Sequence, residues 1–284
     1  MGYANPQALV STEWLEQHLD APDIRVVDAS WYMPQMQRNA RAEYEQEHIR
    51  GSVFFDIDDI ADTDSDLPHM VPSAEKFSSR ARKLGLGDGV RIVIYDGGGC
   101  TAAARCWWML HLFGHDDVSV LDGGLPKWKA EGRPLSSNLT EPRERHLSAR
   151  TNTFLIRDLE QMKRNLTAGR EQVLDARSLG RFNGSEAEPR EGLRGGHIPG
   201  STCLPFPEMF GPDGTFLDAD TLRTRFEQAG VNMKKPVVTT CGSGVTACVL
   251  ALGLHLLGHR QVAVYDGSWT EWGGRSDTPV SRAD

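Results

Sequence analysis

The sequence has no long apolar run. No apolar stretch approaches the roughly 20 residues that a helix needs to span a bilayer. The N-terminal stretch has no basic region followed by an apolar core, so a secretory signal is not expected. The sequence therefore gives no support for a membrane protein or a secreted one.

The sequence also lacks a basic region. The 284 residues carry a formal net charge of −8, and acidic and basic residues are interspersed rather than grouped in blocks. Proteins that bind nucleic acids usually have a basic face, and those that bind membrane surfaces often have a polybasic patch. We therefore expect neither nucleic acid nor a membrane as a partner.

Cysteine is scarce. The chain has five, an odd number without the spacing of a disulfide framework, which favours free thiols in a reducing compartment. We therefore expect a cytoplasmic protein. Cys106, Cys203 and Cys248 are best explained as small buried apolar residues. The sequence leaves open whether Cys100 or Cys248 has a redox role.

What the chain does contain is an internal repeat. At 284 residues it is long for one domain, since domains commonly have roughly 100–200 residues. Matching residues occur in the same order in both halves, 144 to 149 positions apart. We predict two homologous domains, residues 1–140 and 141–284, joined within the polar segment 131–152. The matched pairs are Asp28/Asp175, His48/His197, Gly51/Gly200, Gly114/Gly258, Asp122/Asp266 and Trp128/Trp272.

Within each half, short β-branched runs alternate with helical stretches. This alternation predicts an α/β fold in which each domain is a parallel sheet flanked by helices. Functional sites in such sheets form at the carboxyl ends of strands. The predicted strands are 24–28, 90–95, 118–121, 172–175, 236–240 and 262–265, and the predicted helices are 73–84, 101–113, 218–229 and 245–257.

The segment 235–257 predicts a strand–loop–helix turn that presents Cys241. A buried strand ends at the cysteine, two glycines follow within the next three residues, and a long apolar helix begins after the loop. Glycines let backbone N–H groups converge on one point, and the N-terminus of a helix favours an anion. Such a place favours a thiolate over a thiol. Cys241 is therefore predicted to be a catalytic nucleophile.

The first half has no cysteine at the matching position. When Gly114 is aligned with Gly258, Gly97 falls opposite Cys241, and Cys100 falls beside Gly244. The first domain is therefore predicted to be a catalytically silent copy.

The chain resembles the rhodanese superfamily of sulfurtransferases, and within it the tandem-domain 3-mercaptopyruvate sulfurtransferases. The resemblance covers nearly the whole chain and is carried by EHIRGSVFFDID, GHIPGST, the WWM helix and the loop CGSGVT. Related thiosulfate sulfurtransferases are expected to carry basic residues directly after the cysteine. Here those positions are Gly242 and Ser243, which suit a substrate whose anionic group is bound farther from the sulfur.

The resemblance also implies roles for individual residues. Arg181 and Arg190 would bind the carboxylate and carbonyl of 3-mercaptopyruvate, which fits the two parallel hydrogen bonds that a guanidinium can form. Asp58 and His69 would act with Ser243 as a proton relay. The loop residues implied to lie at the substrate are Gly242, Gly244, Val245 and Thr246.

No metal or organic cofactor is expected. The acidic segment 59–70 lacks the glycine and the terminal glutamate of a calcium loop. The resemblance implies that Cys241 takes sulfur from 3-mercaptopyruvate, releases pyruvate and passes the sulfur to cyanide or a thiol. The thiol would be thioredoxin or a small molecule.

Three alternatives compete with this interpretation. Sulfur transfer from thiosulfate to cyanide is disfavoured by the uncharged loop. A cysteine phosphatase needs an arginine at the far end of its loop, where this chain has Ala247. A non-catalytic binding module describes the first domain well, but it does not explain Cys241, Arg181 and Arg190 together.

Overall fold

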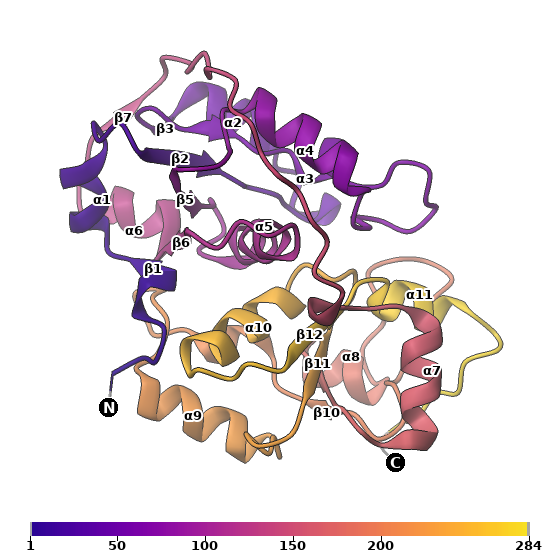
Figure 1. Ribbon diagram of the computed structural model, residues 1–284. Coiled ribbons are helices and arrows are strands. Elements are labelled where there is room, and N and C mark those ends of the chain that lie inside the picture. Colours follow the sequence, from indigo (N-terminus) through magenta and orange to yellow (C-terminus); the bar gives the residue numbers. More distant parts are fainter. Residues whose placement is uncertain (1, 283–284) are drawn as a thin grey trace.

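Two five-stranded parallel sheets organise the chain (Figure 1). The computed structural model describes residues 2–282. The first sheet has the order β1-β6-β5-β2-β4, and the second has the order β8-β12-β11-β9-β10. The first comprises β1 (Leu9–Val10), β2 (Ile24–Asp28), β4 (Val53–Phe54), β5 (Arg91–Tyr95) and β6 (Val118–Leu121). The second comprises β8 (Ile156–Arg157), β9 (Gln172–Asp175), β10 (Thr202–Cys203), β11 (Val237–Thr240) and β12 (Val262–Tyr265).

Helices alternate with these strands along the chain. The first half contains α1 (Thr12–His18), α2 (Ala40–Gln46), α3 (Ile57–Ile60), α4 (Ala74–Lys83), α5 (Thr101–Leu112) and α6 (Gly124–Ala130). The second contains α7 (Leu159–Ala168), α8 (Leu179–Asn183), α9 (Ala219–Gln228), α10 (Ala247–Leu256) and α11 (Ser268–Gly274). Short 3₁₀ turns lie at η1 (Pro6–Ala8), η2 (Pro34–Met36), η3 (Thr153–Leu155) and η4 (Phe206–Met209).

The two sheets have the same topology. When β8, β9, β10, β11 and β12 are set against β1, β2, β4, β5 and β6, the strand orders coincide. The predicted α/β fold, with two domains that each contain a parallel sheet flanked by helices, is therefore confirmed. Residues 137–152 join the halves without regular secondary structure, and the predicted boundary near residue 140 lies in this segment.

The predicted central strands and long helices match the observed ones to within about two residues at each end. The sequence did not indicate the ten-residue helix α7, and the other elements that it did not indicate are shorter. The edge strands β1, β4, β8 and β10 have two residues each, too few to show an alternation. A small antiparallel pair of β3 (His48–Ile49) with β7 (Leu135–Ser136) was also not predicted.

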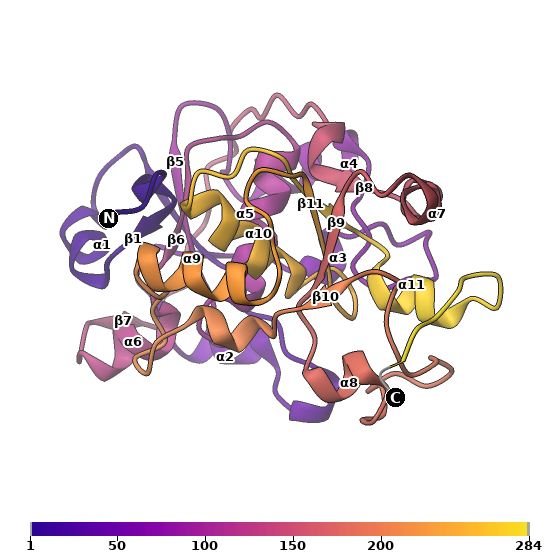
Figure 2. The same ribbon diagram turned by 90° about the horizontal axis from the view of Figure 1, so that it is seen from below.

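Helices α5 and α10 form the contact between the halves, and both views place them side by side at the centre of the molecule (Figures 1 and 2). Nearly every residue of each helix is buried, which is typical of a helix that is apolar on all sides. One hydrophobic cluster runs through both, from Ile92 and Trp108 in the first half to Cys241 and Leu250 in the second. The two domains therefore share one core.

Among the helices of residues 2–282, none combines the length and the apolar character needed to cross a membrane.

A pair of histidines lies in this shared interface. The His255 ring on α10 is 5.7 Å from the His111 ring on α5 and 5.1 Å from the ring of Trp107, measured between centroids. Burial, with a further effect of His111, lowers the pKa of His255 from 6.5 to about 4. Burial also lowers the pKa of His111, and Asp116 partly offsets this.

This interface predicts a loss of stability in acid. The folded state favours the neutral form of His255. The stability that follows from this preference is fully present above pH 6.5, and it is lost as the pH falls through about 4. The shift corresponds to a loss of about 3 kcal/mol in the free energy of unfolding. In His255→Gln, the free energy of unfolding, measured with urea, should fall less between pH 7 and pH 4 than it does in wild type. His146→Gln, at an exposed position, should behave as wild type; an unchanged pH dependence in His255→Gln would contradict the prediction.

Candidate active site

Cys241 follows the last residue of β11 and begins the loop that leads into α10. The start of α11 holds this loop. The Cys241 N–H donates to Ser268 Oγ at 3.2 Å, and the Cys241 carbonyl accepts from the Trp269 N–H at 2.9 Å. The Gly242 carbonyl accepts from both the N–H and the hydroxyl of Thr270, at 2.8 and 2.6 Å. Cys241 therefore sits on a rigid turn, with only 2% of its surface exposed.

The backbone conformation and surroundings of the loop require glycine at position 244, and Gly242 leaves room for an arginine side chain. Gly244 has a φ of +77°, and a Cβ there would lie 2.8 Å from the carbonyl oxygen of Asp266. A Cβ on Gly242 would lie 3.0 Å from Nη2 of Arg181. Thr246, at the N-cap of α10, makes no capping hydrogen bond through its side chain. The first turn of α10 is therefore left without a side-chain cap at the end that faces the loop, where an anion is favoured.

A cavity of about 480 Å³ opens onto this loop. Its lining comes from both domains and is largely apolar on the side of the first, where Trp31, Tyr32, Met33 and Met36 contribute. The predicted residues that line it are Cys241, Gly242, Ser243, Val245, Thr246, Arg181 and Arg190. Gly244, Asp58 and His69 are not part of its lining.

A chain of alternating charges holds Arg181 at the cavity. Arg181 donates to Glu188 Oε2 from Nη2 at 2.6 Å and from Nε at 3.1 Å. The other oxygen of Glu188 accepts from Arg177 Nη1 at 2.6 Å, and Arg177 also pairs with Asp175 at 2.7 Å. Glu188 is 2% exposed and Arg177 is fully buried, so each buried charge has a partner of opposite sign.

The sequence prediction missed Glu188, Arg177 and Asp175 as parts of the site. A signal was present for two of them. Glu188 belongs to the Glu-Pro-Arg segment that contains Arg190, and Asp175 is one of the residues matched between the halves. Nothing in the sequence indicated that Arg177 would join them.

Arg190 has a different environment from Arg181. Its Nη2 donates to Ser243 Oγ at 3.4 Å, a long hydrogen bond. Burial lowers the pKa of Arg190, Arg181 adds to this effect, and the charge of Cys241 opposes it. Arg190 therefore stands between the cavity and the loop, where an anionic ligand would stabilise its charge.

Asp58 and His69 form a pair beside the cavity. His69 Nδ1 lies 2.7 Å from Asp58 Oδ1, and Trp31 Nε1 donates to Asp58 Oδ2 at 3.1 Å. Burial raises the pKa of Asp58, but the hydrogen bonds and charge of His69 and the hydrogen bond of Trp31 outweigh it and lower the pKa overall. Because the carboxylate accepts, the hydrogen of a neutral His69 ring lies on Nδ1, and Nε2 carries the lone pair.

Ser243 is not joined to this pair. The Ser243 hydroxyl accepts from Arg190, and His69 Nε2 is buried without a hydrogen-bond partner. The ring of His69 meets that of Trp31 edge-on at 4.6 Å, and Trp31 lines the cavity. The structure thus assembles the His69–Asp58 half of the predicted relay next to the cavity and leaves its link to Ser243 open.

The matching loop of the first half is filled by its own side chain. The carboxylate of Asp96 accepts from the N–H groups of Gly98 and Ala103, both at 2.7 Å, at the start of α5. Burial raises the pKa of Asp96 to about 6. A Cβ on Gly97 would collide with the hydroxyl of Tyr32. Burial also raises the pKa of Cys100, which is 1% exposed.

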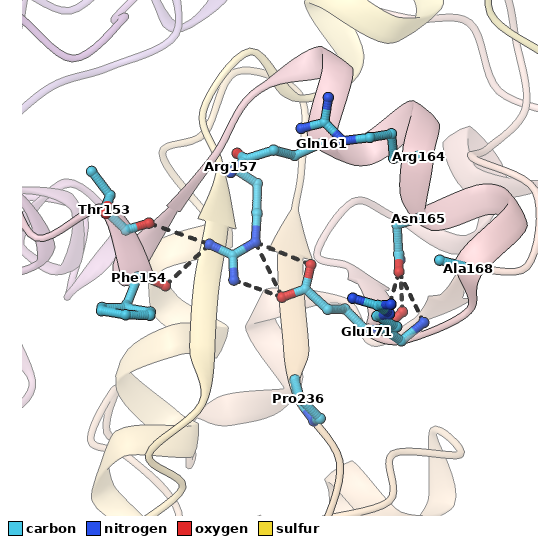
Figure 3. A pocket seen from close by; sticks show the side chains of 10 residues that line it. Thr153, Phe154, Arg157, Gln161, Arg164, Asn165, Ala168, Glu171 and Pro236 are labelled. Atoms are coloured by element: carbon cyan, nitrogen blue, oxygen red, sulfur yellow. Dashed lines mark hydrogen bonds and ion pairs between the residues drawn. The ribbon is translucent and has the colours of Figure 1, made fainter.

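A larger hollow of about 670 Å³ lies elsewhere on the second domain (Figure 3). Cys241 does not line it. Its two most enclosed charged groups are already paired, since Arg157 Nη2 donates to Glu171 Oε1 at 2.7 Å and Arg157 Nε donates to both carboxylate oxygens. The cavity at Cys241 is therefore the better candidate for the active site.

Comparisons with known proteins match the two-domain fold. A family model described as a rhodanese-like domain matches residues 11–131 and 158–275. The chain is 44% identical to thiosulfate/3-mercaptopyruvate sulfurtransferase 1, mitochondrial, of Arabidopsis thaliana, covering 96% of this chain and 78% of the relative. It is 45% identical to the 3-mercaptopyruvate sulfurtransferase of Homo sapiens, covering 95% and 94%. The crystal structure of SseA from Escherichia coli, described as a 3-mercaptopyruvate sulfotransferase, superposes with a TM-score of 0.85 at 38% identity, covering 92% and 98%.

Moving the thiol to the first half should not move the reactivity. In the double variant Gly97→Cys with Cys241→Ser, the new side chain collides with the hydroxyl of Tyr32. The backbone N–H groups that could stabilise a thiolate in this loop are already bound by Asp96. We expect a loss of roughly 1–3 kcal/mol in the free energy of unfolding and no rapid alkylation by iodoacetate at neutral pH, whereas wild type is alkylated at Cys241. Adding Tyr32→Phe should recover stability without recovering alkylation. Rapid alkylation at position 97 would contradict the argument.

Proposed function

The chain belongs to the family of proteins built from rhodanese-like domains, and on that premise we propose that it is a 3-mercaptopyruvate sulfurtransferase that carries sulfur as a persulfide on Cys241. The acceptor is a thiol or cyanide, and the product of the donor is pyruvate.

The observation that carries the choice of donor is the position of the two arginines. A Cβ built on Gly242 would lie 3.0 Å from Arg181 Nη2 and 3.7 Å from Arg190 Nη1, so both guanidinium groups reach the residue next to the nucleophile. Guanidinium groups bind carboxylates well. The loop itself carries no charged side chain after Cys241. A small keto acid therefore fits, with its carboxylate at the arginines and its sulfur at the thiolate.

In the first step the Cys241 thiolate attacks the sulfur of 3-mercaptopyruvate. An S–S bond forms, and the bond between that sulfur and the methylene carbon breaks. The electron pair of the broken bond stays on the carbon as the enolate of pyruvate, and the proton of the donor's thiol is delivered to that carbon. The enzyme then holds a deprotonated persulfide, which the helix N-terminus behind the loop stabilises.

His69 transfers the proton in this first step, and Asp58 assists it. The lone pair of His69 Nε2 accepts the proton of the donor's thiol and returns it to the enolate carbon, and Asp58 fixes the ring and stabilises its charged form. Ser243 completes the relay once bound substrate draws Arg190 away from its hydroxyl.

In the second step a thiolate or cyanide attacks the outer sulfur of the persulfide. The S–S bond breaks, and the Cys241 thiolate is the leaving group, so the resting enzyme is restored. A thiol, either thioredoxin or a small molecule, is the acceptor that suits a cell's reducing compartment. All five cysteines are free, which suits the cytoplasm, although the Arabidopsis relative is named as mitochondrial.

The choice of donor can be tested directly. We expect the purified protein to release pyruvate from 3-mercaptopyruvate with a higher kcat/KM than it releases sulfite from thiosulfate, with cyanide or a thiol as acceptor. Intact mass should increase by about 32 Da, the mass of one sulfur, after treatment with the donor. Cys241→Ser should abolish both signals, whereas Cys203→Ser, at a half-buried cysteine away from the cavity lining, should keep them. An equal or higher efficiency with thiosulfate would overturn the donor assignment.

Glu188 should control affinity for the donor. Glu188→Gln removes the charge that holds Arg181, while Arg177 keeps its pair with Asp175. We expect the KM for 3-mercaptopyruvate to rise by roughly 10-fold, with a smaller change in kcat, because one good charged hydrogen bond is lost. The free energy of unfolding should fall by about 1–3 kcal/mol. Glu191→Gln, at an exposed position of the same loop outside the cavity lining, is the matched control; an unchanged KM in Glu188→Gln would refute this role.

A further inference from the structure

Arg105 is a fully buried arginine in the silent half that reaches the working half. It lies on α5 with no exposed surface, and its guanidinium stacks 4.5 Å from the ring centre of Trp108. Nη2 donates to Asp266 Oδ1 at 2.7 Å and to the carbonyl oxygen of His69 at 2.6 Å. Nη1 donates to the carbonyl of Gly244 at 3.4 Å. One side chain thus touches the segment of His69 and the loop of Cys241.

Asp266 completes this arrangement from the other side. Its second oxygen, Oδ2, accepts from the N–H of Val71 at 2.8 Å. The backbone that follows His69 is therefore tied to one ion pair at two points, through the carbonyl of His69 to Arg105 and through the N–H of Val71 to Asp266. Each member of the pair is 5% exposed or less, so solvent screens it little.

The backbone of His69 needs such support. Its φ is +62°, a left-handed conformation that costs energy for a residue with a side chain. The matching position in the second half, 145 residues later, is Gly214, which has a φ of +78°. There the left-handed conformation is adopted by a glycine, which has no side chain to strain it. The backbone is therefore strained at His69, where an imidazole lies near the Cys241 loop, and it is not strained at the matching Gly214.

The two halves differ in whether an arginine pairs with the aspartate. Asp122, which matches Asp266, accepts from the N–H of Phe216 at 2.8 Å, just as Asp266 accepts from Val71. The residue that matches Arg105 is Val249, so Asp122 receives no arginine there. Burial raises the pKa of Asp122 to about 6. Both halves therefore have the aspartate and the N–H group that it binds, but only the aspartate near Cys241 also has an arginine partner.

We propose that Arg105 and Asp266 are positioning residues, which hold His69 in its left-handed conformation so that Nε2 serves the proton transfer of the sulfur-loading step. This inference rests on the proposed function. It assigns a task to the silent domain, because Arg105 and His69 both come from it. The discharge of the persulfide to cyanide moves no proton and so does not depend on this placement.

The test compares the two half-reactions in Arg105→Lys. Loading is measured as pyruvate released in a single turnover with 3-mercaptopyruvate, and discharge as thiocyanate released when the fully loaded enzyme meets cyanide. We expect loading to slow by roughly 100-fold, the effect of a misplacement of about 1 Å, and discharge to change less than about twofold. Asp266→Asn, which keeps the shape of the side chain, should behave alike and replaces Arg105→Lys if that variant does not fold.

Two further variants separate positioning from general damage. Arg157→Lys is the matched control, since Arg157 also pairs with a carboxylate and with main-chain carbonyls in the hollow of Figure 3, and it should leave both half-reactions unchanged. His69→Asn should slow loading, and Arg105→Lys should slow it no further in that background, because the arginine acts through the histidine.

Three outcomes would overturn the inference. They are normal loading in Arg105→Lys, equal slowing of loading and discharge, and an additive effect of Arg105→Lys in the His69→Asn background. The proposed function fails in a different way, namely if the wild-type protein itself releases no pyruvate from 3-mercaptopyruvate.

Discussion

The packing of α5 against α10 is the contact on which the rest of the structure depends. Each helix begins at the loop that follows a central strand of its own sheet, α5 after β5 and α10 after β11. When the two helices lie side by side, their first turns and the two loops come to face the same space. Gly98 and Thr101 of the first half therefore line the same cavity as Cys241. A site at the carboxyl end of one sheet becomes a site between two domains.

Two buried arginines, one on α5 and one after β9, create an electrostatic problem that the chain solves with aspartate and glutamate. Arg105 and Arg177 have no exposed side-chain surface, and an unpaired charge in such a place would be very costly. Arg105 meets Asp266, and Arg177 meets Asp175 and Glu188. Asp175 and Asp266 follow or end the strands β9 and β12, next to the cavity. The groups that neutralise the buried arginines are thus also the groups that fix the walls of the site.

The sequence predicted those parts of the molecule that depend on local pattern. The repeat, the central strands and the turn at Cys241 are each visible within a short window or a fixed offset, and the structure has the fold they predict. Two-residue edge strands leave no such pattern. The pair of Arg105 with Asp266 spans 161 positions, and no local rule links the two. His69 was placed at the site only by resemblance, because its left-handed backbone and its contact with Asp58 are visible only in three dimensions.

The first half has no cysteine at the position that matches Cys241, and its loop binds a different group. Asp96 occupies the position that matches Thr240, and its carboxylate takes the amides that an anion would use. In a loop without a thiolate, these N–H groups bind an internal carboxylate instead. Other residues of the first half belong to the surroundings of Cys241. Trp31 lines its cavity, Asp58 pairs with His69 beside that cavity, and Arg105 contacts the loop at Gly244. The first domain therefore forms one wall of the cavity at Cys241, although its own loop has no cysteine at the matching position.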